Sequence, residues 1–295
     1  MLCENQFKRY CLHEHKLTRR AEAYLLEARA NEPSRVVGER AKNSVCSWVV
    51  SKKMGRTIST ESRTAERAFV VLSEYDPTVF EYWDQPPPIK IKRVDKNGVA
   101  RFAMYTPDFL ILSQAGPQVV EVKPQDAIEN LINRQPENWV QTTDNSYQYL
   151  PALNAFREIG LEFRVFVYSD EMRFRVANYD LLLNARTAID FDSSLPERLA
   201  VVFEEAFCWT LLELRERLAL RSYTPLLQLI DQQLIVMDLQ EDSLAKPEAC
   251  YVASTEELLM QGRELRQKSL IYRDGSARSI GMDRVPRESD AKVAL

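Results

Sequence analysis

The middle of the chain alternates between helical and strand-like patterns of hydrophobic residues. Residues 60–74 carry apolar side chains from Ala65 to Leu72 at spacings of three and four, which predicts an amphipathic helix. Strand-like runs follow at residues 89–94, 99–105, 109–112, 118–123 and 162–168, and a second helical pattern covers residues 144–158. This order of helix, strands, helix and strand predicts an α/β fold in which helices flank a mixed sheet.

Both ends of the chain are mainly helical. Residues 6–29 predict one or two helices. Beyond about Asn178, three helical segments precede a short apolar run at residues 234–239, which is the order of a winged-helix module and also of helical bundles that dock other proteins. We therefore expect four parts: an N-terminal helical extension at 1–34, an α/β domain at 35–177, a winged-helix-like domain at 178–260 and a flexible, charged tail at 261–295.

Two of the strand-like runs carry candidate catalytic residues at their ends. Asp108 precedes the run at residues 109–112, and Glu121 and Lys123 close the next run after a turn at residues 115–117. Side chains in a strand alternate between faces, so Glu121 and Lys123 point the same way. A hairpin brings Asp108 near them, with the register left open by the sequence.

This set of side chains is typical of one chemistry. Two carboxylates hold Mg²⁺ or Mn²⁺, and the metal polarises a phosphodiester and lowers the pKa of an attacking water. Lys123 then orients that water or offsets negative charge that grows on the phosphate. The simpler alternative is a hairpin whose polar residues face solvent.

Glu66 is the candidate for a third metal ligand. It lies beside the apolar face of the helix predicted at residues 60–74, where a carboxylate usually stays at the surface. Because this helix precedes the strand pair with the other two acidic residues, Glu66 is also placed to join them. The sequence leaves both interpretations open.

Two basic segments are candidates for contact with nucleic acid. The turn at residues 52–56 holds two lysines and an arginine, and it is either a solvated turn or a phosphate contact. In the strand predicted at residues 89–94, Lys90 and Lys92, together with Arg93, give the outward face a positive charge. That face either meets DNA or serves solubility.

Composition restricts how the protein binds DNA. Its formal net charge is −4, so contact with nucleic acid must use local basic patches, a partner protein or metal ions that bridge to phosphates. The five cysteines are scattered and odd in number, which argues against a disulfide framework. No run reaches the roughly eighteen apolar residues of a membrane span and no signal-peptide pattern opens the chain, so we place the protein in the cytoplasm.

Several short motifs stand in a characteristic order: Gly55-Arg56, Glu61-Ser62, Glu66, Asp76-Pro77-x-Val79, Gln85-Pro86, Tyr105-Thr106-Pro107-Asp108-Phe109-Leu110 and Glu121-Val122-Lys123-Pro124. Their order and spacing over residues 35–170 resemble the TnsA endonuclease subunit of heteromeric, Tn-seven-like transposases. The resemblance implies a PD-(D/E)xK, restriction-endonuclease-like mixed sheet flanked by helices at residues 35–177, followed by the winged-helix-like domain.

The resemblance also implies an activity and its participants. Glu66, Asp108 and Glu121 are expected to ligate Mg²⁺, with Mn²⁺ as a substitute, and Lys123 to assist the water or the phosphate. The expected substrate is DNA at transposon ends, cut on the 5′ (non-transferred) strands during cut-and-paste transposition. The expected partners are a DDE-type transposase subunit and an AAA+ ATPase regulator, in a bacterial cytoplasm and at the nucleoid during activity.

Two alternatives from other functional classes stay open. One is a stand-alone restriction or repair endonuclease built on the same core. The other is a non-enzymatic module that binds DNA or protein, in which the nuclease-like fold only supports the helical domain.

Overall fold

The computed structural model describes residues 1–31, 47–60, 62, 64–188 and 192–275 of the 295-residue chain. Their contacts divide the chain into two compact units, Met1–Asp170 and Glu171–Leu295. The sequence placed this division at residue 177 instead. The expectation for the basic residues 35–42 lies outside the described residues.

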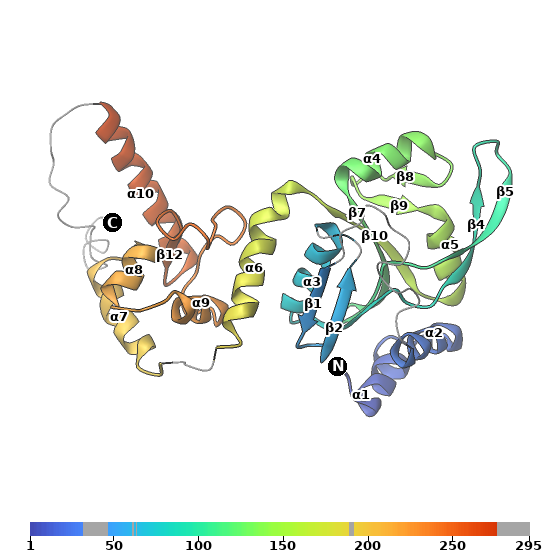
Figure 1. Ribbon diagram of the computed structural model, residues 1–295, viewed down its shortest axis with the longest axis horizontal. Coiled ribbons are helices and arrows are strands. Elements are labelled where there is room, and N and C mark those ends of the chain that lie inside the picture. Colours follow the sequence, from blue (N-terminus) through green and yellow to red (C-terminus); the bar gives the residue numbers. More distant parts are fainter. Residues whose placement is uncertain (32–46, 61, 63, 189–191, 276–295) are drawn as a thin grey trace. The chain divides into compact units, whose positions relative to one another are not determined.

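A mixed four-stranded sheet forms the centre of the first unit (Figure 1). Its strands, in spatial order, are β10 (Glu162–Tyr168), β7 (Gly116–Pro124), β6 (Phe109–Ser113) and β3 (Val79–Asp84). β10 runs parallel to β7, whereas β7, β6 and β3 pair antiparallel. The predicted α/β fold with a mixed sheet is therefore confirmed.

Helices cover both faces of this sheet. Helix α3 (Ala65–Tyr75) places Phe69 with its ring centroid 5.3 Å from that of Phe166, and α5 (Leu150–Ile159) stacks Phe156 on Phe163 at 5.9 Å. Phe163 and Phe166 are three residues apart in β10, so strand alternation puts them on opposite faces. Helix α4 (Gln125–Arg134) follows β7 directly.

Three two-stranded antiparallel hairpins accompany the sheet in the first unit. They are β1 (Ser47–Ser51) with β2 (Arg56–Thr60), β4 (Ile89–Val94) with β5 (Ala100–Tyr105), and β8 (Trp139–Gln141) with β9 (Tyr147–Tyr149). Two predicted helices start later than expected, since β2 includes Thr60 and β9 includes residues 147–149. Helix α3 starts at Ala65 rather than at residue 60, and α5 starts at Leu150 rather than at residue 144, so Pro151 lies in its first turn, where proline is tolerated.

The basic turn at residues 52–56 has a structural role. The Nζ of Lys53 donates to the carbonyl oxygens of Ser73 and Asp76, at 2.7 and 2.6 Å, and so satisfies the C-terminal end of α3. Arg56 forms an ion pair with the buried Asp84. The turn therefore stabilises the unit, and two of its three cations are engaged inside it.

The N-terminal helices pack on the first unit. They are α1 (Glu4–Arg9), a π-helical turn (Tyr10–Glu14) and α2 (Arg19–Ala30), so the expected one or two helices at residues 6–29 are present. The hydroxyl of Tyr10 donates to the carbonyl oxygen of Ser113 in β6 at 3.0 Å, and that of Tyr24 donates to Pro87 at 2.7 Å. The segment assigned from the sequence to an extension thus belongs to the same compact unit as the sheet.

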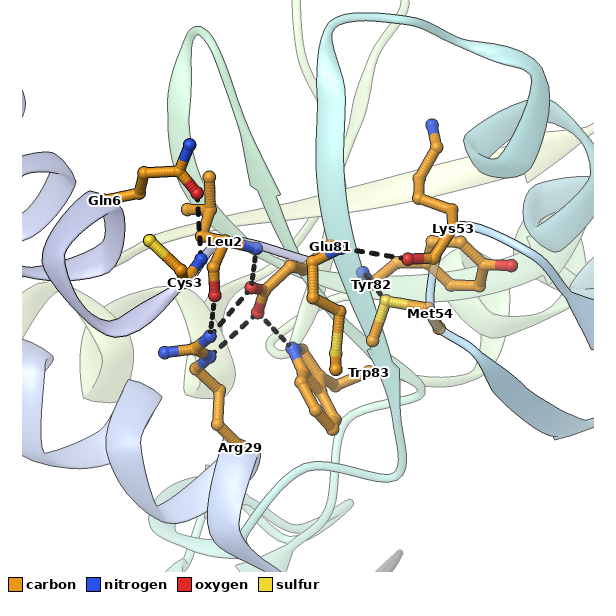
Figure 2. Close-up of polar contacts among 10 residues, drawn as sticks. Leu2, Cys3, Gln6, Arg29, Lys53, Met54, Glu81, Tyr82 and Trp83 are labelled. Carbon is orange, nitrogen blue, oxygen red and sulfur yellow. Dashed lines mark hydrogen bonds and ion pairs between the residues drawn. The ribbon is translucent and has the colours of Figure 1, made fainter.

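A buried carboxylate ties the N terminus to the sheet (Figure 2). Glu81 in β3 has no solvent exposure, and its oxygens accept hydrogen bonds from the guanidinium of Arg29 at 3.0 Å, from the backbone N–H of Leu2 at 2.8 Å and from the indole of Trp83 at 3.0 Å. A buried charge is tolerated when its oxygens are satisfied in this way. Removal of Arg29 would leave the carboxylate of Glu81 buried without its counter-ion.

We predict that Arg29→Met destabilises the first unit by about 3 kcal/mol, because it leaves the Glu81 carboxylate without its counter-ion. Urea unfolding followed by tryptophan fluorescence measures the change. Lys8→Met is the control, since it breaks the exposed ion pair of Lys8 with Glu4 and should leave the unfolding curve unchanged. Equal curves for both variants would contradict the role of this buried pair.

The second unit is mainly helical. Its elements are α6 (Arg173–Ala185), α7 (Leu195–Glu205), β11 (Cys208–Thr210), α8 (Leu211–Arg217), α9 (Thr224–Asp231), β12 (Tyr251–Ala253) and α10 (Glu256–Gly275). β11 pairs antiparallel with β12, and Val236 bridges to Ala253. The three helices expected at residues 196–233 are present with a strand before the second one, while the winged-helix assignment stays a prediction.

The segment expected to form a flexible tail from residue 261 continues helix α10 as far as Gly275. Gly262 in this helix lies close to Cys208 of β11, and the expected flexibility of the tail stays a prediction. A Cβ added at Gly262 would lie 2.5 Å from the Sγ of Cys208, and Arg263 forms ion pairs with Asp238 and Asp242. The expectation for residues 276–295 lies outside the described residues.

Two further expectations concern membrane spans and disulfide bonds. Within the described ranges, no helix is both long and apolar enough to cross a membrane. The cysteines in these ranges, Cys3, Cys11, Cys208 and Cys250, are free thiols, and Cys46 lies outside the ranges.

Candidate active site

The β6–β7 hairpin brings the predicted acidic residues together. Phe109 pairs with Val120, so Asp108, one residue earlier, lies across from Glu121, one residue later. Alternation then turns both carboxylates toward the sheet face opposite Phe109. The expected hairpin is confirmed, with its turn at residues 114–115 rather than at residues 115–117 because Gly116 and Pro117 already belong to β7.

Lys123 lies between the two carboxylates. Its Nζ is 2.5 Å from Oε1 of Glu121 and 3.6 Å from Oδ2 of Asp108. It also donates to the carbonyl oxygen of Val122 at 3.0 Å. All three charged side chains are largely buried, so their interactions are weakly screened by solvent. The structure therefore gathers three of the four residues that the sequence singled out.

Neighbouring groups hold the two carboxylates in position. The backbone N–H of Val122 donates to Oδ2 of Asp108 at 2.7 Å, and the backbone N–H of Gln85 donates to the carbonyl oxygen of Asp108 at 2.9 Å. The hydroxyl of Tyr105 donates to Oε2 of Glu121. Both oxygens of Glu121 are thus engaged, one by Lys123 and the other by Tyr105.

Tyr105 is a site residue that the sequence analysis missed. It ends β5, three residues before Asp108, and its ring lies 5.6 Å from that of Tyr149. Its place in the Tyr-Thr-Pro-Asp motif was the available signal, but β5 and β7 belong to different sheets. Their approach depends on tertiary packing, which spacing along the chain does not reveal.

The pKa of Glu121 is unusually high for a carboxylic acid. Burial, together with the nearby charge of Asp108, raises the pKa of Glu121 to about 7, and Lys123 opposes this rise only in part. Burial lowers the pKa of the Lys123 ammonium, but the charges of Asp108, Glu121 and Glu66 outweigh it and raise that pKa. The carboxylates of Asp108 and Glu121 repel each other, and the ammonium of Lys123 relieves this repulsion only in part.

Glu66 comes from a different element than the other three residues. It lies in the first turn of α3, the helix that covers the sheet face opposite Glu121. Its charge still contributes to the raised pKa of Lys123, so it lies within electrostatic reach of the site. In the described part of the chain, no three carboxylate, histidine or cysteine side chains form a ready metal-binding group.

The donor set fits a hard divalent cation. Asp108 and Glu121 supply carboxylate oxygens, which Mg²⁺ and Mn²⁺ prefer, and their mutual repulsion is what a cation between them relieves. Mg²⁺ is commonly held by one or two protein carboxylates, with water and substrate oxygens as its other ligands. Two carboxylates are therefore a sufficient protein contribution, and Glu66 is the nearest candidate for a third.

A mixed sheet with helices on both faces, and with an Asp…Glu-x-Lys set at one hairpin, is the arrangement of a restriction-endonuclease-like domain. Residues 76–167 match the family model described as TnsA-like endonuclease N terminal, so this part of the chain is similar to that family. The match includes Asp108, Glu121 and Lys123 and leaves out Glu66. No curated protein matches the chain.

The raised pKa of Glu121 predicts a pH-dependent stability. The unfolded chain has the ordinary pKa of 4.5, so the folded state binds this proton more tightly and loses stability as pH rises through about 7. In EDTA, Glu121→Gln should therefore melt above the wild type at about pH 8, and the difference should shrink toward about pH 4.5.

Divalent cations should reverse this difference. Mn²⁺ should raise the melting temperature of the wild type and have a much smaller effect on Glu121→Gln. Glu158→Gln, at an exposed position of α5, is the matched control and should behave as the wild type does. A melting difference that does not change with pH would argue against a repelling carboxylate pair.

Proposed function

We propose that this protein is a Mg²⁺-dependent DNA endonuclease that serves as the nuclease subunit of a heteromeric transposase. It cuts the 5′ (non-transferred) strands at transposon ends, and a DDE-type partner subunit acts on the 3′ ends. The convergence of Asp108, Glu121 and Lys123 inside a TnsA-like endonuclease domain is the observation that supports this proposal best.

Each residue has a role in the proposed reaction. Asp108 and Glu121 hold Mg²⁺, with Glu66 as the third carboxylate. The bound ion supplies Lewis acidity toward the phosphodiester and a lowered pKa for the attacking water. The ammonium of Lys123 offsets negative charge on the phosphate oxygens while water attacks phosphorus and the bond to the leaving oxygen breaks. Tyr105 orients Glu121 through its hydroxyl.

The proposed partners follow from the family resemblance and from charge. A chain of net charge −4 gains little from non-specific attraction to DNA, so a subunit that partners deliver to its substrate suits this composition. The second unit is the proposed site for a DNA or protein contact of the winged-helix kind. An AAA+ ATPase regulator is the other proposed partner.

Substitutions at the site test the proposed chemistry. Asp108→Asn, Lys123→Ala and Glu66→Gln should each lower 5′-strand nicking of end-labelled transposon DNA by at least about a hundredfold, because each removes charge from the reacting centre. The assay uses the assembled transposase complex with Mg²⁺, and circular dichroism checks folding. Glu158→Gln should nick as the wild type does. Wild-type nicking by all three site variants would show that the site is assigned wrongly.

A comparison of the isolated protein with the complex separates the main proposal from the stand-alone alternative. We expect little cutting of plasmid DNA by the purified protein in Mg²⁺, and cutting at transposon ends after addition of the transposase subunit. Rapid cutting of plain plasmid by the isolated protein, lost in Asp108→Asn, would instead favour a restriction or repair endonuclease.

A further inference from the structure

The β4–β5 hairpin exposes a face that combines lysines with large apolar side chains. In Figure 1 this hairpin extends beyond the helices and the central sheet of the first unit. Lys90 pairs across the strands with Met104, and Lys92 pairs with Phe102, so all four side chains share one face. Phe102 and Met104 are 67% and 66% exposed, and the Nζ of Lys90 lies 4.5 Å from the centroid of the Phe102 ring.

The charge of the hairpin differs from that of the chain. Residues 89–105 hold five basic side chains and one acidic side chain, whereas the whole protein has a net charge of −4. The single acid, Asp95, is paired with Arg101 at 2.7 Å. Within the described residues, no carboxylate pairs with Lys90 or Lys92. This face therefore presents cations that suit a polyanion.

The hairpin is fixed to the rest of the unit near its turn, where Val94 and Ala100 form the last pair of the ribbon. The buried amide of Asn138 accepts a hydrogen bond from the backbone N–H of Val94 at 2.9 Å and donates to the carbonyl oxygen of Val94 at 2.7 Å. On the face opposite the lysines, Ile91 is buried. A ribbon held in this way is itself pre-organised, so less conformational entropy is lost when a ligand binds to it.

The same hairpin leads directly into the candidate active site. Met104 belongs to the exposed face, and the next residue, Tyr105, donates its hydroxyl to Glu121. Strands rise about 3.3 Å per residue, so Lys92 and Phe102 lie roughly 10 Å along the ribbon from Tyr105. Alternation turns Met104 and Tyr105 to opposite faces of the ribbon, so a ligand on the exposed face reaches the site around the edge of the ribbon, over a path of this length along the strand.

We propose that the β4–β5 hairpin grips the DNA duplex beside the phosphate that is cut. Lys90 and Lys92 contact backbone phosphates, and Phe102 and Met104 make apolar contacts with sugars and base edges. A two-stranded ribbon fits the major groove, which is about 12 Å wide in B-DNA. The inference rests on the proposed function, since it assigns the substrate contact that the net charge of the protein does not supply.

Salt-dependent DNA binding tests this proposal. The full chain is titrated with a fluorescein-labelled duplex in EDTA, where no cutting occurs, and anisotropy is measured at several salt concentrations. Lys90→Glu with Lys92→Glu should weaken binding by at least about tenfold and lower the slope of log K against log salt by roughly 1.8, about 0.9 per lost phosphate contact. Arg19→Glu with Arg20→Glu is the matched control, because it makes the same change in net charge on α2 and should have a much smaller effect.

A second variant tests the apolar contacts. Phe102→Ala with Met104→Ala should weaken binding severalfold and leave the salt slope unchanged, because no charge is removed. If both hairpin variants bind DNA as the wild type does, or if the wild type does not bind the duplex at any salt concentration, the proposal is overturned. Loss of self-association in Phe102→Ala with Met104→Ala, at unchanged DNA affinity, would also overturn it and identify a protein contact.

Failure of this proposal is distinguishable from failure of the proposed function. Hairpin variants with normal DNA affinity, together with an inactive Asp108→Asn, would remove only the hairpin contact. Full nicking by Asp108→Asn, together with weakened DNA binding by the hairpin variants, would overturn only the assignment of the active site.

Discussion

The register of the β6–β7 hairpin is the constraint on which the account of this protein depends. It sets Asp108 across from Glu121 and turns both carboxylates to one face, where Lys123 lies between them. A slip of one residue would send one carboxylate to the other face. The short turn at residues 114–115 fixes this register, and the burial of Phe109, Leu110, Val119 and Val120 holds the paired strands inside the domain. Packing of apolar residues thus maintains a like-charge pair that is unfavourable by itself, and this strain is what a divalent cation would relieve.

Local features of the site were predictable from the sequence, and distant ones were not. The pairing of Asp108 with Glu121 and Lys123 followed from two strands joined by a short turn, because hairpin neighbours in sequence are neighbours in space. Tyr105 escaped notice because it reaches Glu121 from a separate sheet. The sequence left the role of the basic turn open because the partners of Lys53 and Arg56, at Ser73, Asp76 and Asp84, are supplied by later elements. The N-terminal helices were taken for an extension because the contact of Arg29 with Glu81 spans more than fifty residues.

The two basic segments of the first unit differ in their surroundings, since one stabilises the unit and the other carries the proposed contact with DNA. Lys53 and Arg56 pair with groups inside the unit, whereas Lys90 and Lys92 point outward beside Phe102 and Met104. The strand that carries Phe102 ends at Tyr105, so the exposed ribbon and the carboxylate pair are joined by one rigid segment of chain. A protein of net negative charge can in this way concentrate its contact with DNA where the phosphate must be placed.

The most direct test of the central claim is the location of a bound metal ion. Crystals of the protein soaked in Mn²⁺ would be measured near the manganese absorption edge, and an anomalous difference map would locate the ion. The account predicts a peak between the carboxylates of Asp108 and Glu121, with Lys123 displaced from its contact with Glu121. A map without a peak at this position, or with a peak elsewhere while Lys123 keeps both contacts, would contradict it.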